Sequence, residues 1–357
     1  MDEVRKAGWD CDSFKSPVPD GINFGFIKQF WSELKDDFMR FVSEFHRNGR
    51  LTKGVNATFI ALIPKVDSPQ RLNDFRPISL VGCLYKVLAK ILANRLRYVI
   101  GSVVSDSQSA FVKGKQILDS ILVANEAVDE ACRLDKDMLL FKVDFEKAYD
   151  SVDLKYLEAV MVKMNFPTLW RKWMLECIGT ATTSVLVNGC PTDEFPIERG
   201  LRQGDPLSPF LFLLVAEGFN VLMPSSVEAG LFNDYHVGQG TKLCLSHLQF
   251  ADDTLIIGKK CWVNVRSIRV VLLIFKHLSG LKVNFQKSLL TGVNVSDTWL
   301  NEASLLLNCR VGTLPFVYLG LPIGGDPRRL DFWKPIVNNI ISRLSNWKIN
   351  FFRLVVA

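Results

Sequence analysis

The sequence predicts a mixed α+β fold in which strands and helices are interleaved in one body. Three observations support this prediction. The chain has 357 residues, of which 48% are hydrophobic, so it can bury a substantial core. Apolar residues recur at helical spacing in some segments and at strand spacing in others. Repeats, low-complexity tracts and flexible linkers are absent from the sequence, which favours interleaved elements over separate modules.

Composition narrows the class of protein. A net charge of +6 suits a partner that bears phosphates, although many ordinary enzymes carry a similar excess. The eight cysteines show no C-x-x-C spacing and no neighbouring histidine cluster, which argues against a zinc site or a disulfide framework and favours a reducing compartment. No apolar signal segment opens the chain, and the richest apolar run carries Glu217 and is too short to span a bilayer. We therefore expect an intracellular protein of the nucleus or cytoplasm, with no membrane partner.

The first third of the chain alternates helices with a strand. "FIKQFWSELKDDFMRFVSEF" predicts an amphipathic helix on which Asp36 and Asp37 form a solvated face. "NATFIALIPK" predicts a strand that stops at Pro64. Residues 83–100 predict a second helix, and "ILDSILVANEAVDEACR" a third. The basic residues of the second helix lie off its apolar face, where they form either a solvated surface, which is the simpler interpretation, or a contact with nucleic acid.

In the middle of the chain, segments with a strand-like pattern of apolar residues alternate with helical ones. "MLLFKVDF" predicts a strand that ends in Asp144, and "EKAYDSVDLKYLEAVMVKM" returns to helical spacing. Asn188-Gly189 interrupts an alternating segment and signals a hairpin. Ser208 as N-cap and Pro209 at the first helical position predict the start of another helix.

Paired aspartates then stand between two apolar runs in "HLQFADDTLIIG", which predicts two short strands around a tight turn. If this hairpin neighbours the strand that ends in Asp144, the carboxylates of Asp144, Asp252 and Asp253 converge. Such a cluster repels itself unless a multivalent cation lies within it, and Mg²⁺ prefers oxygen ligands. Two such ions about 3.5 to 4 Å apart would activate an attacking hydroxyl and stabilise a leaving oxygen. The alternative is that Asp144 caps a helix and the pair only makes a turn, and spacing alone leaves both open.

Five ordered blocks resemble the palm of reverse transcriptases: "FKVDFEKAYDSVD", "ERGLRQGDPLSPFLF", "QFADDTLI", "GLKVNFQKS" and "VYLGLPIGG". "IPKVDSPQRLNDFRPISLVGCLYKVLAKILANRL" before them is similar to the fingers of these enzymes. The wording is closest to non-LTR retrotransposons of the long interspersed (LINE) class in plant genomes, and fits group II intron maturases less well. The resemblance implies a right-hand polymerase architecture with fingers and a palm, the palm being an antiparallel sheet backed by helices.

The resemblance also divides the chain. Residues 1–53 are expected to form an N-terminal extension, 54–325 the fingers and palm, and 326–357 the start of a thumb. After "SRLSNWK" the family continues into a full thumb, whereas this chain reads "INFFRLVVA" and stops, so we expect a truncated copy. Val18 stands where the family usually has a glycine, which changes the expected turn in the N-terminal segment.

The implied function is RNA-directed DNA polymerase, which extends a DNA primer on an RNA template with dNTPs and two Mg²⁺ ions that Mn²⁺ could replace. A catalytically inactive nucleic-acid-binding remnant is the alternative from another class. The third possibility is that the reading frame is a genomic relic that yields no stable protein.

Carried over residue by residue, the resemblance assigns Asp144, Asp252 and Asp253 as catalytic metal-binding aspartates, with the carbonyl of Phe145 as a backbone ligand. Asp252 is expected to be the firmer metal ligand, and Asp253 to act more through the local field and the hairpin. Tyr149 matches the steric gate against a 2′-hydroxyl, its alternative being a core aromatic.

Further roles follow from the same blocks. Asp205 is expected to be structural, capping the following helix, and Lys287 to protonate departing pyrophosphate unless it is only a surface lysine. The predicted dNTP-binding residues are Lys65, Arg76, Gln203 and Gly204, the predicted primer grip is Leu319, Gly320 and Leu321, and Gly200 permits close backbone approach.

Overall fold

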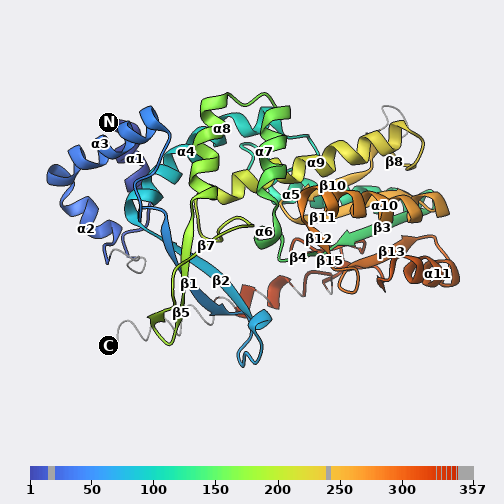
Figure 1. Ribbon diagram of the computed structural model, residues 1–357. Coiled ribbons are helices and arrows are strands. Elements are labelled where there is room, and N and C mark those ends of the chain that lie inside the picture. The colour runs from blue at the N-terminus through green and yellow to red at the C-terminus, as the bar shows by residue number, and fades with distance from the viewer. Residues whose placement is uncertain are drawn as a thin grey trace. The chain divides into compact units, whose positions relative to one another are not determined.

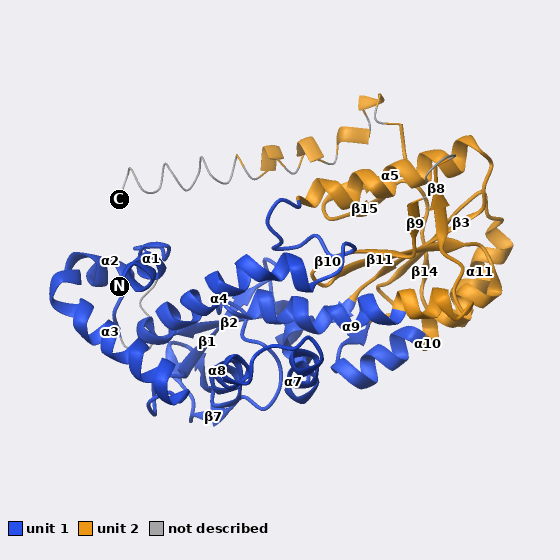
Figure 2. Ribbon diagram, turned by 90° about the horizontal axis from the view of Figure 1, so that it is seen from above, with its two compact units in different colours: residues 1–115, 145–222, 271–283 blue, residues 116–144, 223–270, 284–357 orange. Residues whose placement is uncertain are grey.

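The computed structural model describes residues 1–14, 21–238, 243–326 and, within 328–344, all but 331, 335, 339 and 343 (Figure 1). The predictions on Val18 and on the tail "INFFRLVVA" therefore lie outside the described residues. The chain divides into two compact units, each built from three separate segments (Figure 2). Unit 1 comprises residues 1–115, 145–222 and 271–283, and unit 2 comprises residues 116–144, 223–270 and 284–357.

Unit 1 combines a helical N-terminal part with a mixed sheet. Its helices are α1 (Asp2–Trp9), α2 (Phe24–Gln29), α3 (Trp31–Asn48), the 3₁₀ helix η1 (Leu72–Asp74), α4 (Cys83–Val103), α6 (Ala148–Ser151), α7 (Leu154–Lys163) and α8 (Thr168–Gly179). Its strands are β1 (Ala57–Pro64), β2 (Phe75–Val81), β4 (Phe145–Glu146), β5 (Thr182–Val187), β6 (Cys190–Pro191), β7 (Phe195–Pro196) and β12 (Lys282–Val283). Two further helices pass from one unit into the other: α9 (Ser208–Glu228) and α10 (Trp262–Ser279).

The sheet of unit 1 has the order β2-β1-β5-β6, with β7 also paired to β5. β1 and β2 form a long antiparallel hairpin, and β1 runs parallel to β5. The N-terminal helices bury their apolar faces against α4: Val4 and Ala7 of α1 and Phe38 of α3 share a core with Val87 and Ile91. Burial of each such large side chain contributes about 1.5–3 kcal/mol, so α1 to α3 are tied to the unit by their apolar faces.

Unit 2 is built around a five-stranded sheet. Its elements are α5 (Ile117–Arg133), β3 (Met138–Val143), β8 (Tyr235–Val237), β9 (Leu243–Leu245), β10 (His247–Phe250), β11 (Asp253–Lys259), β13 (Leu289–Val293), α11 (Asp297–Leu307), β14 (Arg310–Val311), β15 (Phe316–Tyr318) and β16 (Leu321–Ile323). The sheet order is β10-β11-β3-β13-β14, antiparallel except for the β13–β14 pair.

Both faces of this sheet are buried. Met138, Leu140, Leu255 and Ile257 point to one face and pack with the apolar side of α5, which runs along the sheet in Figure 2. Phe141, on the alternate position of β3, faces the other way and is also fully buried. The predicted α+β fold with an antiparallel sheet backed by helices is confirmed.

Several local predictions are confirmed as well. β1 ends at Pro64, and the Asn188-Gly189 hairpin joins β5 to β6. Asp36 and Asp37 lie exposed on α3. Ser208 begins α9 as its first helical residue rather than preceding it, a one-residue difference at a helix end.

The apolar run around Glu217 is longer than the sequence reading allowed. α9 has 21 residues, so by length and composition it is a candidate to cross a membrane, and the prediction that the run is too short was wrong. However, 61% of its apolar window is buried inside the protein, and the buried core helix of a soluble protein meets the same criteria of length and composition. Leu211, Leu213 and Leu214 of α9 have no exposed surface.

Candidate active site

The paired aspartates lie at the turn between β10 and β11. Phe250 pairs with Asp253, so Ala251 and Asp252 form a two-residue turn. Ala251 has φ +55°, a left-handed conformation that costs a non-glycine residue roughly 1–2 kcal/mol. Its side chain is buried while Asp252 and Asp253 are exposed, so the turn presents both carboxylates to solvent.

Pairing of β11 with the central strand β3 brings the third carboxylate to the same end of the sheet. Thr254 lies opposite Val143, and one further step of this antiparallel register puts Asp253 opposite Asp144. Partial desolvation and the charge of Asp252 raise the pKa of Asp253, Lys142 opposes the shift, and Asp144 adds to it. The three aspartates therefore lie together at one end of the unit 2 sheet, where the charges of Asp252 and Asp144 raise the pKa of Asp253.

Asp144 is held through its backbone. Its N–H donates to Ser288 Oγ at 3.0 Å, and its carbonyl accepts from the N–H of Asn284 at 2.7 Å. Ser288 has no exposed surface, and its hydroxyl donates to the Asn284 carbonyl at 2.9 Å. The predicted proton donor Lys287 lies exposed in this same turn, with its N–H on Asn284. Ser288 ends the "GLKVNFQKS" block but was not among the predicted site residues.

Replacing Ser288 by alanine is expected to lower the free energy of unfolding by about 1–3 kcal/mol, because the partly buried N–H of Asp144 loses its acceptor. Because Asp144 then loses a support, we expect primer extension to slow as well. Denaturant unfolding and single-nucleotide incorporation measure the two effects. The matched control is Ser304→Ala, since that hydroxyl only bonds a carbonyl within α11. Equal effects of the two substitutions would contradict the assigned support.

Two hydrogen bonds tie the β15–β16 hairpin to the strands that carry the aspartates. Lys142 Nζ donates to the carbonyl of Val317 at 2.8 Å, and the Tyr318 hydroxyl donates to the carbonyl of Asp253 at 3.2 Å. The turn of this hairpin is Leu319-Gly320, both residues having positive φ, with Tyr318 paired to Leu321. The predicted primer-grip residues therefore lie in unit 2, anchored to the same carboxylate turn.

The predicted nucleotide residues belong to unit 1. Tyr149 stacks on Phe212 of α9, with ring centroids 4.6 Å apart and planes 16° from parallel. Gln203 Nε2 donates to Asp150 Oδ1 at 3.1 Å. Burial raises the pKa of Asp150, while the Gln203 hydrogen bond and the charges of Lys147 and Lys65 oppose the shift. Tyr149, Gln203 and Lys65 thus share the surroundings of Asp150, a residue that sequence analysis did not single out.

Lys65 and Arg76 lie on the β1–β2 hairpin, and Gly204 lies on the loop that packs against β2. Arg76 is exposed on β2 opposite Ile63, and Lys65 Nζ donates to the carbonyl of Asn73 at 3.1 Å. Gly204 has φ +101°, and a Cβ there would lie 3.0 Å from the Ser79 carbonyl oxygen. A side chain at this position would therefore be strained, and β2 or the loop would have to shift by a few tenths of an ångström.

Gly200 allows an even closer approach in the same loop. It has φ +87°, and a Cβ there would lie 2.6 Å from the carbonyl oxygen of Asp150. Phe145, the predicted backbone ligand, begins β4 and pairs with Val283 of β12 within unit 1. The division of the chain thus places the three aspartates in unit 2 and the residues predicted to bind the nucleotide in unit 1.

Asp205 has a structural role, in line with its prediction. It is buried, forms an ion pair with Arg202 at 2.9 Å, and accepts the Tyr85 hydroxyl at 2.7 Å. Its other carboxylate oxygen accepts from the N–H of Leu207, just before α9. Arg202 also donates to Asn56 at 2.7 Å and lies over the Tyr85 ring. This buried network fixes the loop between Gly200 and α9.

The family model described as "Reverse transcriptase (RNA-dependent DNA polymerase)" matches residues 63–323. The chain belongs to the reverse transcriptase family. The matched residues include all three aspartates and every predicted site residue.

Two known proteins are similar in sequence to this reverse transcriptase chain over most of its length. It is 27% identical over 288 residues to the transposon TX1 uncharacterized 149 kDa protein of Xenopus laevis, covering 81% of the chain and 22% of that protein. It is 25% identical over 319 residues to the Pol polyprotein of the type-2 retrotransposable element R2DM of Drosophila melanogaster, covering 89% and 28%. The chain thus spans between a fifth and a third of the length of these relatives.

A solved structure supports the fold independently. The telomerase of Candida albicans, in complex with a fragment of telomeric RNA, superposes with a TM-score of 0.51 at 14% identity, covering 83% of this chain and 48% of that one. At this identity the likeness concerns the fold alone. It agrees with the polymerase fingers and palm that the sequence predicted.

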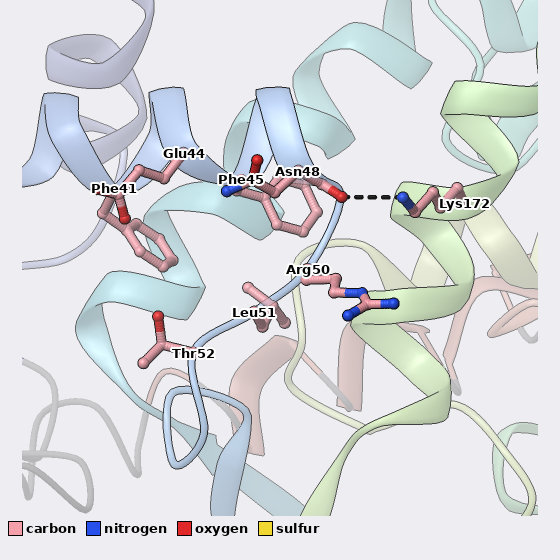
Figure 3. A pocket seen from close by; sticks show the side chains of 8 residues that line it. All are labelled: Phe41, Glu44, Phe45, Asn48, Arg50, Leu51, Thr52 and Lys172. Carbon is pink, nitrogen blue, oxygen red and sulfur yellow. Dashed lines mark hydrogen bonds between the residues drawn. The ribbon is translucent and has the colours of Figure 1, made fainter.

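A pocket of the reverse transcriptase chain lies outside these blocks, between α3 and α8 of unit 1. In Figure 3 Lys172 reaches from α8 to the end of α3, where its Nζ donates to the carbonyl of Asn48 at 2.9 Å. The N–H of Leu51 donates to Glu176 at 2.8 Å. The pocket is lined by Phe41, Glu44, Phe45, Asn48, Arg50, Leu51, Thr52 and Lys172. It holds none of the predicted site residues, and its bonds anchor the N-terminal helices to α8.

Proposed function

We propose that this chain catalyses RNA-directed DNA synthesis, the extension of a DNA 3′-hydroxyl with dNTPs on an RNA template. The observation that carries the proposal is the group of Asp144, Asp252 and Asp253 at one end of the unit 2 sheet. The residues of the five sequence blocks support an origin in an element of the long interspersed, non-LTR class as found in plant genomes. An intracellular site of action, in the nucleus or cytoplasm, fits this function.

The donor set fits hard divalent cations. All three side chains offer carboxylate oxygens, and the mutual effect of their charges on the pKa of Asp253 is the repulsion that a cation would relieve. Asp144 and Asp252 would hold Mg²⁺, or Mn²⁺ in its place, with the Phe145 carbonyl as a further oxygen. Bound Mg²⁺ supplies a Lewis acid that favours the attacking and leaving oxygens of phosphoryl transfer.

The protein's own residues would position the reacting groups. Ser288 and Asn284 hold the Asp144 backbone, and the Tyr318 hydroxyl holds the carbonyl of Asp253. Lys287 would give a proton to the departing pyrophosphate, and Leu319 to Leu321 would contact the primer end. On unit 1, Lys65 and Arg76 would bind the triphosphate through charge-assisted hydrogen bonds, and Gln203 and Gly204 would border the new base pair.

Replacing Tyr149 by valine is expected to raise ribonucleotide incorporation relative to deoxyribonucleotide by about 10- to 100-fold, because the ring that would meet a 2′-hydroxyl is gone. The ring of Tyr149 stacks on Phe212, which supports its position. Competition between rUTP and dTTP in single-nucleotide extension measures the ratio. Tyr98→Val is the matched control, since Tyr98 lies 78% exposed on α4. An unchanged ratio of ribonucleotide to deoxyribonucleotide incorporation in Tyr149→Val would contradict the assignment of Tyr149 as the steric gate.

Primer extension on poly(rA)/oligo(dT) with Mg²⁺ and dTTP tests the proposed function. We expect elongated oligo(dT) that depends on template and on divalent metal. Salt-dependent RNA binding without nucleotide incorporation would instead support the alternative function, that of a nucleic-acid-binding protein without catalytic activity. The salt dependence of binding is measured in the same preparation, so the two outcomes are separable.

A further inference from the structure

We propose that Asp234, His236 and Cys244 form a second metal site, on the β8–β9 hairpin of unit 2, which binds Zn²⁺ or a similar transition-metal ion. The proposal is independent of the proposed polymerase activity. It concerns donor atoms that the predicted Mg²⁺ site does not use.

The fold brings the three side chains together. His236 and Cys244 are directly paired across the antiparallel β8–β9 strands, so their side chains leave the same face. Asp234 precedes His236 by two residues, which puts it on that face as well. The carboxylate oxygen, imidazole nitrogen and thiol sulfur all lie within 4.8 Å of one another. His236 Nε2 lies 3.1 Å from Asp234 Oδ1.

The donor chemistry selects the ion. A thiolate, an imidazole and a carboxylate together suit Zn²⁺, whereas Mg²⁺ prefers oxygen ligands and would leave sulfur out. At zinc bond lengths of about 2.0–2.3 Å, tetrahedral ligand atoms lie roughly 3.5 Å apart, so modest side-chain rotation closes the site. On binding, the Cys244 thiol releases its proton to solvent and the sulfur forms the metal bond. Three protein ligands leave one position for water.

Access to the site is open. Asp234 and His236 are half-buried and Cys244 is exposed, so an ion can enter without any local unfolding. The sequence argued against zinc because the cysteines lack C-x-x-C spacing. Strand pairing, rather than close spacing along the chain, brings Cys244 next to His236.

Metal binding at this place would cross-link two strands that form only a two-stranded sheet. Such a sheet is marginal alone, so a bond across it would fix the register of β8 against β9. β9 leads through Ser246 into β10, which ends at the carboxylate turn. The ion would therefore brace the strand that supports Asp252.

Titration with Co²⁺ tests the site, because a cobalt–thiolate bond gives a near-ultraviolet charge-transfer band that carboxylates cannot produce. We expect one equivalent of Co²⁺ to produce this band in the reduced full chain, and Zn²⁺ to abolish it. Cys244→Ser should lose the band, and His236→Ala should weaken cobalt binding at least tenfold. Far-ultraviolet circular dichroism checks that each variant is folded.

Two controls isolate the site. Cys132→Ser removes another exposed thiol of unit 2 and should keep the band. Asp252→Asn should also keep it, which separates this site from the Mg²⁺ donors. Zn²⁺ should raise the melting temperature of the wild-type chain and leave that of Cys244→Ser unchanged. Absence of the band in the wild type, or its persistence in Cys244→Ser, would overturn the proposal.

Discussion

Replacing Asp252 by asparagine is expected to lower the rate of single-nucleotide incorporation by about 10³-fold or more, which corresponds to roughly 4 kcal/mol of transition-state stabilisation. Asp252 lies exposed at the β10–β11 turn, so the amide should be accommodated without loss of fold. The loss arises because the turn keeps its shape but no longer offers a charged oxygen to a cation. Rapid-quench extension at saturating dTTP and Mg²⁺ measures the rate.

The chain contains a matched control for this substitution. Asp36 and Asp37 form the same dipeptide on the exposed face of α3, so Asp36→Asn makes the same chemical change away from the site. We expect Asp36→Asn to extend the primer at the wild-type rate. A similar rate for Asp252→Asn and the wild type would refute the catalytic assignment of the turn.

Replacing Arg202 by methionine is expected to lower the free energy of unfolding by about 3–5 kcal/mol. Arg202 and Asp205 are almost completely buried and 2.9 Å apart, so removal of the guanidinium leaves a buried carboxylate without its cation. The substitution also removes the donors to Asn56 and to the carbonyl of Cys177. Chemical denaturation measures the loss, and a lower denaturation midpoint is expected at unchanged slope.

Arg199 provides the comparison within the same loop. Its side chain is 60% exposed and lies 3.8 Å from Asp153, a geometry in which an ion pair contributes about 0–1 kcal/mol. Arg199→Met should therefore unfold at nearly the wild-type denaturant concentration. If the two variants were equally stable, the buried network would not be what fixes the loop before α9.

Periodicity predicted the strands and turns well because the period of buried residues is a local property. β3 and the β10–β11 hairpin follow from apolar spacing, and their expected pairing brought the three aspartates together. The residues that hold the site were not predicted, because their contacts join positions far apart in the sequence. Ser288 bonds Asp144 across 144 residues of sequence, and Lys142 bonds Val317 across 175. Nothing in the local sequence marks either contact.

Helix continuity was harder to predict than helix presence. The segment around Asp36 was expected to be one helix, but Phe30 has φ −103° and ψ +29° and separates α2 from α3. The segment after Asp144 also breaks, because the Asp153 side chain accepts from the N–H of Tyr156 and starts α7 afresh. At Asp153, a side chain that competes for a backbone hydrogen bond overrides apolar spacing.

The alternation of segments between the two units has a practical consequence for anyone who divides this chain. Each unit is assembled from three segments, so the backbone passes between units five times. No single cut separates the two units, and any contiguous fragment that contains all of one unit also contains segments of the other. An expression fragment that stops after residue 222, for example, contains α5 and β3 but lacks the strands that flank β3. Separate study of the units therefore requires rejoining their segments by designed linkers.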